Sequence, residues 1–199
     1  MRSHGRLVIP GLFAVLIVAA TAAPLQAAEV NLNFYPLSGR SLDGDFWSPV
    51  EDQAAFGGTV DFGPQGSPLH FAIGTHLSVG EEEFGSFDDN VTGVVNEVSF
   101  GAAKVWGKQG RTRFFLSGGV SFVWAAMDVD DFFFGSVDDN DDSIGYWAET
   151  GIYWRLGTNF GLGFYGRILE GTDITLFGVE GNADYWQAGP ALVWSWPAR

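Results

Sequence analysis

Residues 144–168 constrain the fold more than any other part of the chain, because they read as one strand, one tight turn and a second strand. Apolar and aromatic residues alternate with glycine, polar and charged residues, and Gly157, Thr158 and Asn159 supply the turn. Successive side chains of a strand point to opposite faces. The pattern therefore predicts a hairpin with one aromatic, apolar face and one face that carries glycine and charge.

The same alternation recurs along the chain. Strands are predicted at residues 30–35, 55–62, 69–79, 91–106, 113–124, 144–156, 160–168 and 186–196. Long connections are predicted at 36–54, 80–90, 128–143 and 171–184, and short turns at 63–68, 107–111 and 157–159. An even strand count with short turns at one end and long loops at the other is typical of a closed barrel of the outer-membrane type. We therefore predict an all-β fold, an eight-stranded antiparallel up-and-down transmembrane β-barrel.

The segment 91–106 interrupts the pattern, because Asn96 and Lys104 fall on the apolar parity. A bulge in this strand would change its register, so the sequence leaves its facing open.

The N-terminus predicts export. Arg2 and Arg6 precede an apolar stretch at 7–20, and small residues at 25–28 offer a cleavage site. This is the pattern of a secretory signal peptide, expected over residues 1–28, with a single barrel domain over 29–199 in the outer membrane. No apolar run of about 18 residues follows it, so we expect no membrane-spanning helix.

Charge and cysteine content exclude some functions. The chain has 10 basic and 24 acidic residues, a net charge of −14, and no cysteine. Without Arg2 and Arg6 the net charge becomes −16. Nucleic acid is therefore not expected as a partner, since a polyanion needs a cationic surface. Thiol chemistry is absent, and we expect no cofactor.

Tryptophans near the predicted strand ends suit the two interfaces of a membrane. They are Trp106, Trp124, Trp154, Trp186 and Trp196. The alternative is a soluble periplasmic barrel or sandwich whose apolar faces form an ordinary core. In that soluble alternative, the solvent-exposed face of the strands would be the one rich in glycine and serine.

The last strand carries the most specific motif. Residues 187–194 read Gln-Ala-Gly-Pro-Ala-Leu-Val-Trp: a polar residue, then glycine, a hydrophobic residue and an aromatic. Here, and over residues 29–196 as a whole, the chain resembles the small eight-stranded outer-membrane β-barrel proteins of Gram-negative bacteria. The resemblance implies recognition by the barrel-assembly machinery through Gln187, Gly189, Leu192 and Trp194. It also implies a monomer surrounded by outer-membrane lipid and lipopolysaccharide. The chain departs from the pattern by running on to Arg199, and Pro190 removes one ladder donor.

If the apolar face of each strand meets lipid, the side chains on its opposite face fill the lumen. The resulting lumen network is predicted to contain Asp61, His70, Glu97, Arg113, Glu149, Arg155 and Arg167. Eight strands enclose a space just wide enough for side chains, and lone buried charges are costly. We therefore predict a polar plug without a wide pore. A narrow channel, or transport of small or hydrophobic solutes, is the alternative function.

Two further groups of residues suggest chemistry. His76, Ser78 and Glu97 have the residue types of a nucleophile triad, as in barrels that resemble lipid A deacylases. The asparagine that follows the serine in those enzymes is Val79 here, and the register directs these side chains into the lumen. A lipid A acylhydrolase is therefore a second alternative, and no catalytic residue is assigned.

The acidic segment 128–143 has clustered oxygen ligands that suit calcium, but it lacks the glycine and the final glutamate of an EF-hand loop. A solvated acidic loop is the simpler interpretation. Phe132, Phe133 and Phe134 lie in the same segment and suit either a contact with a partner or packing over the barrel mouth. The sequence thus predicts a structural or cell-surface interaction role and leaves the ligand of the loops open.

Overall fold

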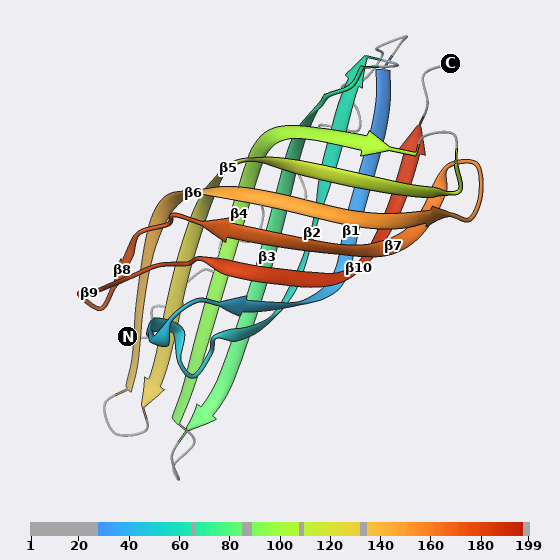
Figure 1. Cartoon of the computed structure of the whole chain (residues 1–199). Coiled ribbons are helices and arrows are strands. Elements are labelled where there is room, and N and C mark those ends of the chain that lie inside the picture. Colours follow the sequence, from blue (N-terminus) through green and yellow to red (C-terminus); the bar gives the residue numbers. More distant parts are fainter. Residues whose placement is uncertain (1–27, 65–66, 85–88, 108–109, 132–134, 197–199) are drawn as a thin grey trace.

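The computed structural model describes residues 28–64, 67–84, 89–107, 110–131 and 135–196, which form a closed barrel (Figure 1). Residues 1–27 of the predicted signal peptide, and Phe132, Phe133 and Phe134, lie outside the described residues. In the part of the chain that the structure describes, no helix is long and apolar enough to cross a membrane.

Eight antiparallel strands pair in the order β1-β10-β7-β6-β5-β4-β3-β2, and pairing of the first strand, β1, with the last, β10, closes the ring. They are β1 (Ala28–Leu42), β2 (Asp52–Pro64), β3 (His70–Phe84), β4 (Asp89–Trp106), β5 (Thr112–Asp131), β6 (Gly135–Arg155), β7 (Phe160–Glu170) and β10 (Tyr185–Trp196). A 3-10 helix η1 (Asp45–Trp47) and a small hairpin of β8 (Ile174–Leu176) and β9 (Val179–Gly181) lie in two of the connections. The predicted eight-stranded up-and-down barrel is confirmed.

Alternation along each strand separates an outer apolar face from a buried inner face. Phe71 is 70% exposed, whereas Ala72 beside it is 2% exposed. Large apolar side chains exposed on the outer face include Phe56, Phe100, Phe114, Leu116, Phe122, Trp124, Tyr146, Trp154, Phe164, Ile168 and Trp186. The core of the molecule is therefore the barrel interior, and the outer face is an apolar belt.

β4 runs through without a bulge. Its pairing with β3 and with β5 is continuous from one end to the other. Glu97 is fully buried inside, and Asn96 and Lys104 share the outward parity. The Lys104 ammonium lies 5.0 Å from the centre of the Trp106 ring, which places a cation beside an aromatic residue at the strand end. The interruption of the pattern thus reflects polar residues on the outer face.

β1 is longer than predicted, because a bulge lies where the sequence suggested the start of a loop. The register with β2 shifts between Tyr35 and Ser38, and the strand then continues to Leu42. A bulge adds one residue, so it exchanges the two faces of the strand beyond it. Arg40 therefore points inward, on the same side as Tyr35. The predicted connection 36–54 is wrong: the connection is 43–51.

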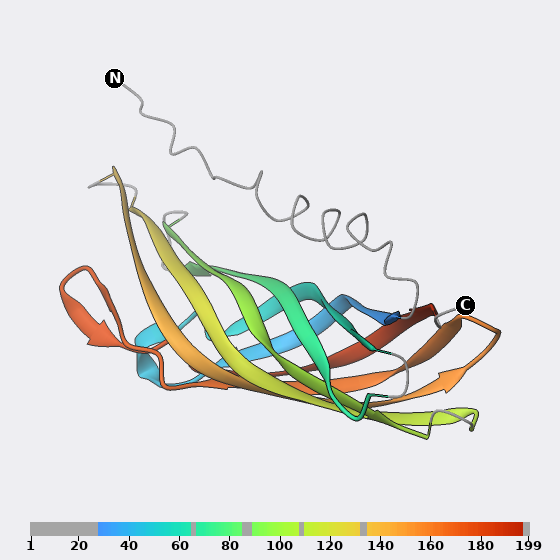
Figure 2. The ribbon, with the colours of Figure 1, turned by 90° about the horizontal axis from the view of Figure 1, so that it is seen from above.

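Two of the predicted acidic loops are strands over most of their length. β3 and β4 remain paired as far as Phe84 and Asp89, and β5 and β6 as far as Asp131 and Gly135. These hairpins extend beyond the other strands at the end of the barrel that carries the connections 43–51 and 171–184, which we call the loop end (Figures 1 and 2). The predictions of loops at 80–90 and 128–143 are therefore wrong. Their charge misled the interpretation, since a strand that leaves an apolar belt can carry carboxylates and keep its backbone pairing.

The loop end of the interior is apolar and is filled by the connections. Trp47 of η1 is completely buried, and its Nε1 donates a hydrogen bond to the carbonyl of Asn182 at 2.6 Å. We call this cluster the apolar plug; it includes Leu42, Trp47, Val50, Val91, Val95, Val123, Ala125, Leu169, Ile174, Leu176 and Ala183. The predicted polar filling is thus confined to the middle and the turn end of the barrel.

Candidate functional site in the barrel interior

The centre of the interior is an ion cluster from three strands. Arg167 on β7 donates from Nη2 to Glu97 on β4, and from Nη1 to Glu149 on β6 at 3.2 Å. All three side chains are completely buried. One guanidinium therefore bridges two carboxylates, and its planar set of donors suits such paired contacts.

Hydroxyl groups satisfy the remaining oxygens of the two carboxylates. The Tyr185 hydroxyl donates to Glu97 and accepts from Nε of Arg167 at 2.9 Å. The Tyr35 hydroxyl donates to Oε1 of Glu149 at 2.5 Å, and Ser121 donates to Glu97 at 3.0 Å. Buried charges are tolerated where they are paired and hydrogen-bonded, so this arrangement can exist without water.

Arg40 supplies the second cation of the centre. Its Nε and Nη2 donate to Oε1 of Gln187 at 2.9 and 2.7 Å, and Nη1 donates to Ser78 at 3.0 Å. Nη2 also lies 3.9 Å from Glu97, and the guanidinium stacks on the Tyr185 ring at 3.8 Å. Two arginines thus balance two glutamates. We call Arg40, Glu97, Glu149 and Arg167, with their hydroxyl and amide partners, the central network.

The central network also joins the strands at the closure of the barrel. Gln187 on β10 donates to Ser38 on β1 at 2.9 Å, and also to the Tyr165 hydroxyl. Tyr165 donates to Ser38 at 2.9 Å and stacks on Tyr35 with 3.7 Å between ring centroids. These contacts connect β1, β7 and β10 inside the barrel, in addition to their backbone pairing.

A smaller polar cluster lies nearer the turn end. Asp61 is 2.8 Å from Nδ1 of His70 and accepts from Asn31 at 2.8 Å and from Asn33 at 3.5 Å. All four side chains are buried. Five of the seven predicted lumen residues thus fall into two groups, with Asp61 and His70 in one and Glu97, Glu149 and Arg167 in the other.

The other two predicted lumen residues lie at the turn ends of their strands. Arg113 is 7% exposed near the start of β5. Arg155 is the last residue of β6 and donates from Nη2 to the carbonyl of Thr158 at 2.5 Å. Arg155 is therefore part of the rim and contacts neither cluster.

Arg40, Ser38 and Tyr185 are members of the central network that the sequence does not predict. Arg40 and Ser38 fall in the predicted connection 36–54, because the bulge that turns them inward has no clear alternation around it. Tyr185 lies just before the predicted last strand, although it stands two residues ahead of Gln187 on the same parity. That spacing was the signal that identifies it.

The three residue types of a nucleophile triad do not form one. The Ser78 hydroxyl donates to Oε1 of Gln53 at 2.5 Å and accepts from Arg40. His76 stacks on Tyr35, and its Nε2 lies 3.8 Å from Glu149. Triads are recognised by a hydrogen bond from nucleophile to base, and among the described residues neither ring nitrogen of His76 has a hydrogen-bond partner.

Two of the acidic side chains on β6 hold the β8–β9 hairpin. Asp141 accepts from the backbone nitrogen of Thr175 at 2.7 Å, and Asp139 accepts from that of Phe177 at 2.6 Å. The Ser143 hydroxyl accepts from the backbone nitrogen of Asp173 at 2.9 Å. Among the described residues, no group of three or more His, Asp or Glu side chains is placed to hold a metal ion.

The predicted assembly motif lies on both faces of β10. Gln187 points into the central network, whereas Leu192 and Trp194 are half-buried residues of the outward parity. Pro190 lies opposite the β1 bulge, since the register with β1 shifts between the pairs Phe34–Leu192 and Gly39–Ala188. The missing ladder donor of Pro190 thus coincides with a place where regular pairing is already interrupted.

No family model matches the chain, and no curated protein matches it. Solved structures do. The outer membrane protein Ail of Yersinia pestis, crystallised with the heparin analogue sucrose octasulfate, matches with a TM-score of 0.53 at 11% identity, over 84% of this chain and 99% of that one. OprG of Pseudomonas aeruginosa matches with a TM-score of 0.48 at 12% identity, over 86% and 97% of the two chains. Neisserial surface protein A matches with a TM-score of 0.47 at 14% identity, over 85% of this chain and 97% of that one.

At these identities the likeness concerns the fold. Together with the closed ring of eight strands, it shows that the chain has the fold of the small eight-stranded outer-membrane β-barrels.

Proposed function

We propose that this protein is a non-enzymatic outer-membrane barrel that anchors a cell-surface interaction platform and does not conduct solutes. The observation that carries the proposal is the closed interior. Glu97, Glu149 and Arg167 are completely buried in mid-barrel, and the apolar plug around Trp47 closes the loop end. A solute would have to displace both layers in turn.

The height of the apolar belt supports the membrane placement. On β10 the outward aromatic residues run from Trp186 to Trp196, and on β5 from Phe114 to Trp124. Ten residues span about 33 Å along a strand at about 3.3 Å per residue. With a strand tilt of about 40°, this corresponds to a band about 25 Å tall, the height of the apolar band of outer-membrane barrels.

The platform consists of the strand extensions and the hairpin beyond this belt. Carboxylates occupy the extensions, among them Glu81, Glu82, Glu83, Asp128, Asp138, Asp139, Asp141 and Asp142. In this proposal the belt meets outer-membrane lipid, and the platform stands in the lipopolysaccharide layer as part of a monomer. Recognition by the barrel-assembly machinery through Gln187, Gly189, Leu192 and Trp194 belongs to the same proposal.

Conductance in planar lipid bilayers tests the closed interior. The purified full chain should give no reproducible current steps under conditions in which a general porin, run in parallel, conducts. Stable unitary steps would contradict the proposal and favour the narrow channel.

Lipid A masses from cells with and without the protein should be the same, since Ser78 is bound to Gln53 and Arg40.

A further inference from the structure

Cationic side chains are segregated along the barrel axis. Among the described residues there are six lysines and arginines, of which Arg40 and Arg167 belong to the central network. The other four are Lys104, Arg111, Arg113 and Arg155, at the turn ends of β4, β5 and β6. The turn end is thus cationic in a chain whose net charge is −14.

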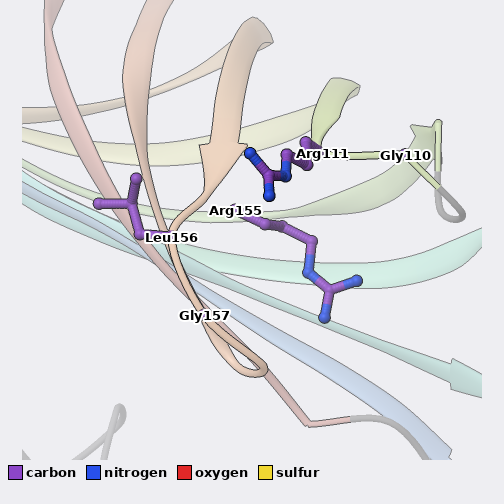
Figure 3. A pocket seen from close by; sticks show the side chains of 5 residues that line it. All are labelled: Gly110, Arg111, Arg155, Leu156 and Gly157. Atoms are coloured by element: carbon purple, nitrogen blue, oxygen red, sulfur yellow. The ribbon is translucent and has the colours of Figure 1, made fainter.

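A cavity of about 450 Å³ lies at this end, between the β4–β5 and β6–β7 turns (Figure 3). It is lined by Gly110, Arg111, Arg155, Leu156 and Gly157. A hydrogen bond of 2.8 Å from the backbone nitrogen of Arg155 to the carbonyl of Arg111 joins the two walls. The lining therefore contains two guanidinium groups and no carboxylate.

Neither guanidinium has a counter-ion within the described part of the chain. The Arg111 side chain is exposed and makes no hydrogen bond or ion pair with the described residues. Arg155 donates to the Thr158 carbonyl, which carries no net charge. Two arginines that line one cavity both make the potential there more positive, so binding of an anion would be favoured on charge alone. Guanidinium donors match the oxygens of phosphate in particular.

One wall of the cavity continues the apolar belt. Leu156 is 65% exposed; it directly follows the end of β6 and keeps the outward parity of Trp154. The Lys104 ammonium, over the Trp106 ring, marks the same end of the belt. The cavity therefore offers guanidinium groups to a phosphate and an apolar wall to the chain attached to it.

We propose that this turn-end cavity binds the phosphodiester of an anionic glycerophospholipid, with Arg111 and Arg155 on the phosphate and Leu156 against the first acyl segment. The inference rests on the proposed function, because it requires the turn end to meet a phospholipid leaflet. The occupant is a lipid and not free phosphate, because the apolar wall of the cavity is continuous with the apolar belt.

Native mass spectrometry of the full chain, purified in detergent, tests this site. Dioleoylphosphatidylglycerol is titrated against dioleoylphosphatidylcholine, and inorganic phosphate is tested separately. The Arg111→Gln and Arg155→Gln variants and their combination are compared with Lys104→Gln, which removes one charge from the same end but outside the cavity lining. In the double variant, the affinity for dioleoylphosphatidylglycerol should fall by about tenfold or more. In the Lys104→Gln variant, this affinity should fall by less than about twofold.

Three outcomes overturn the inference: unchanged lipid binding in the double variant, an equal loss in Lys104→Gln, or binding of inorganic phosphate without a preference for the anionic lipid. Each variant is first checked for the gel shift on heating that a folded barrel shows. If the unaltered chain itself lacks this shift, the proposed function fails, whatever the cavity binds.

Discussion

Arg167 on β7 donates a hydrogen bond to Glu97 on β4 across the inside of the barrel, although the two residues are 70 positions apart. Two strands, β5 and β6, separate β4 from β7 in the sheet, so no backbone pairing joins them. The ion pair therefore fixes the cross-section of the barrel and, with Glu149, closes its middle.

Replacing Arg167 by methionine should destabilise the barrel strongly. The change leaves Glu97 and Glu149 buried without their shared cation, and breaking a buried pair in this way costs about 3–5 kcal/mol. Urea unfolding in lipid vesicles, followed by tryptophan fluorescence, measures the loss. Arg155→Met at the rim is the matched control and should cost less than about 1 kcal/mol. Equal midpoints for the two variants would contradict the role of the central network.

Inserting one alanine after Leu37 should place Arg40 on the outward face of β1. The bulge already holds one extra residue, so a second one shifts the rest of the strand by one position, and the guanidinium would leave Gln187 and Ser78 and meet lipid. We expect most of the protein to lose the folded, heat-shifted form on gels. Leu37→Ala, which keeps the number of residues in the bulge, should retain it. An insertion variant that folds as well as Leu37→Ala would show that the length of this segment does not position Arg40.

Trp47→Ala should loosen the apolar plug and leave the barrel closed. Trp47 is completely buried and bonded to the Asn182 carbonyl, and truncation of a buried tryptophan costs about 3–5 kcal/mol. Limited proteolysis should then cut within 43–51 or 171–184, while the gel shift on heating persists. Phe177→Ala, at a residue that is 42% exposed, serves as the control. Unchanged proteolysis in Trp47→Ala would mean that other contacts hold the plug.

Asp139→Ala and Asp141→Ala should release the β8–β9 hairpin. Each carboxylate accepts one backbone hydrogen bond from the hairpin, Asp139 from Phe177 and Asp141 from Thr175. Hydrogen exchange at those two amides should accelerate about fivefold or more, which corresponds to about 1 kcal/mol per bond. Asp138→Ala, on the same strand, is the control and should leave both amides unchanged. Unaltered exchange in the first two variants would mean that apolar contacts with the plug, and not these hydrogen bonds, hold the hairpin in place.

The sequence predicted the strand count, the closure and the facing of most strands, because aromatic and polar residues alternate with a period of two wherever a strand separates the apolar belt from the interior. The acidic ends of β3, β4, β5 and β6 were missed for the converse reason. There the strands lie beyond the apolar belt, so charged residues replace the aromatic signal while the backbone pairing continues.

Within the site, Glu97, Glu149 and Arg167 were predictable from parity, and Arg40 was not. Its facing depends on one extra residue between Tyr35 and Ser38, which local composition does not reveal. The plug was also missed, since Trp47, Val50 and Ile174 come from connections and meet the interior only through tertiary contacts.

Gel mobility of the protein from an outer-membrane fraction, with and without boiling in detergent, tests the central claim most directly. A closed barrel with a paired interior should resist the detergent at room temperature and migrate differently after heating. Recovery in the soluble periplasmic fraction, with no shift on heating, would contradict the account and make the outer aromatic belt the core of a soluble protein.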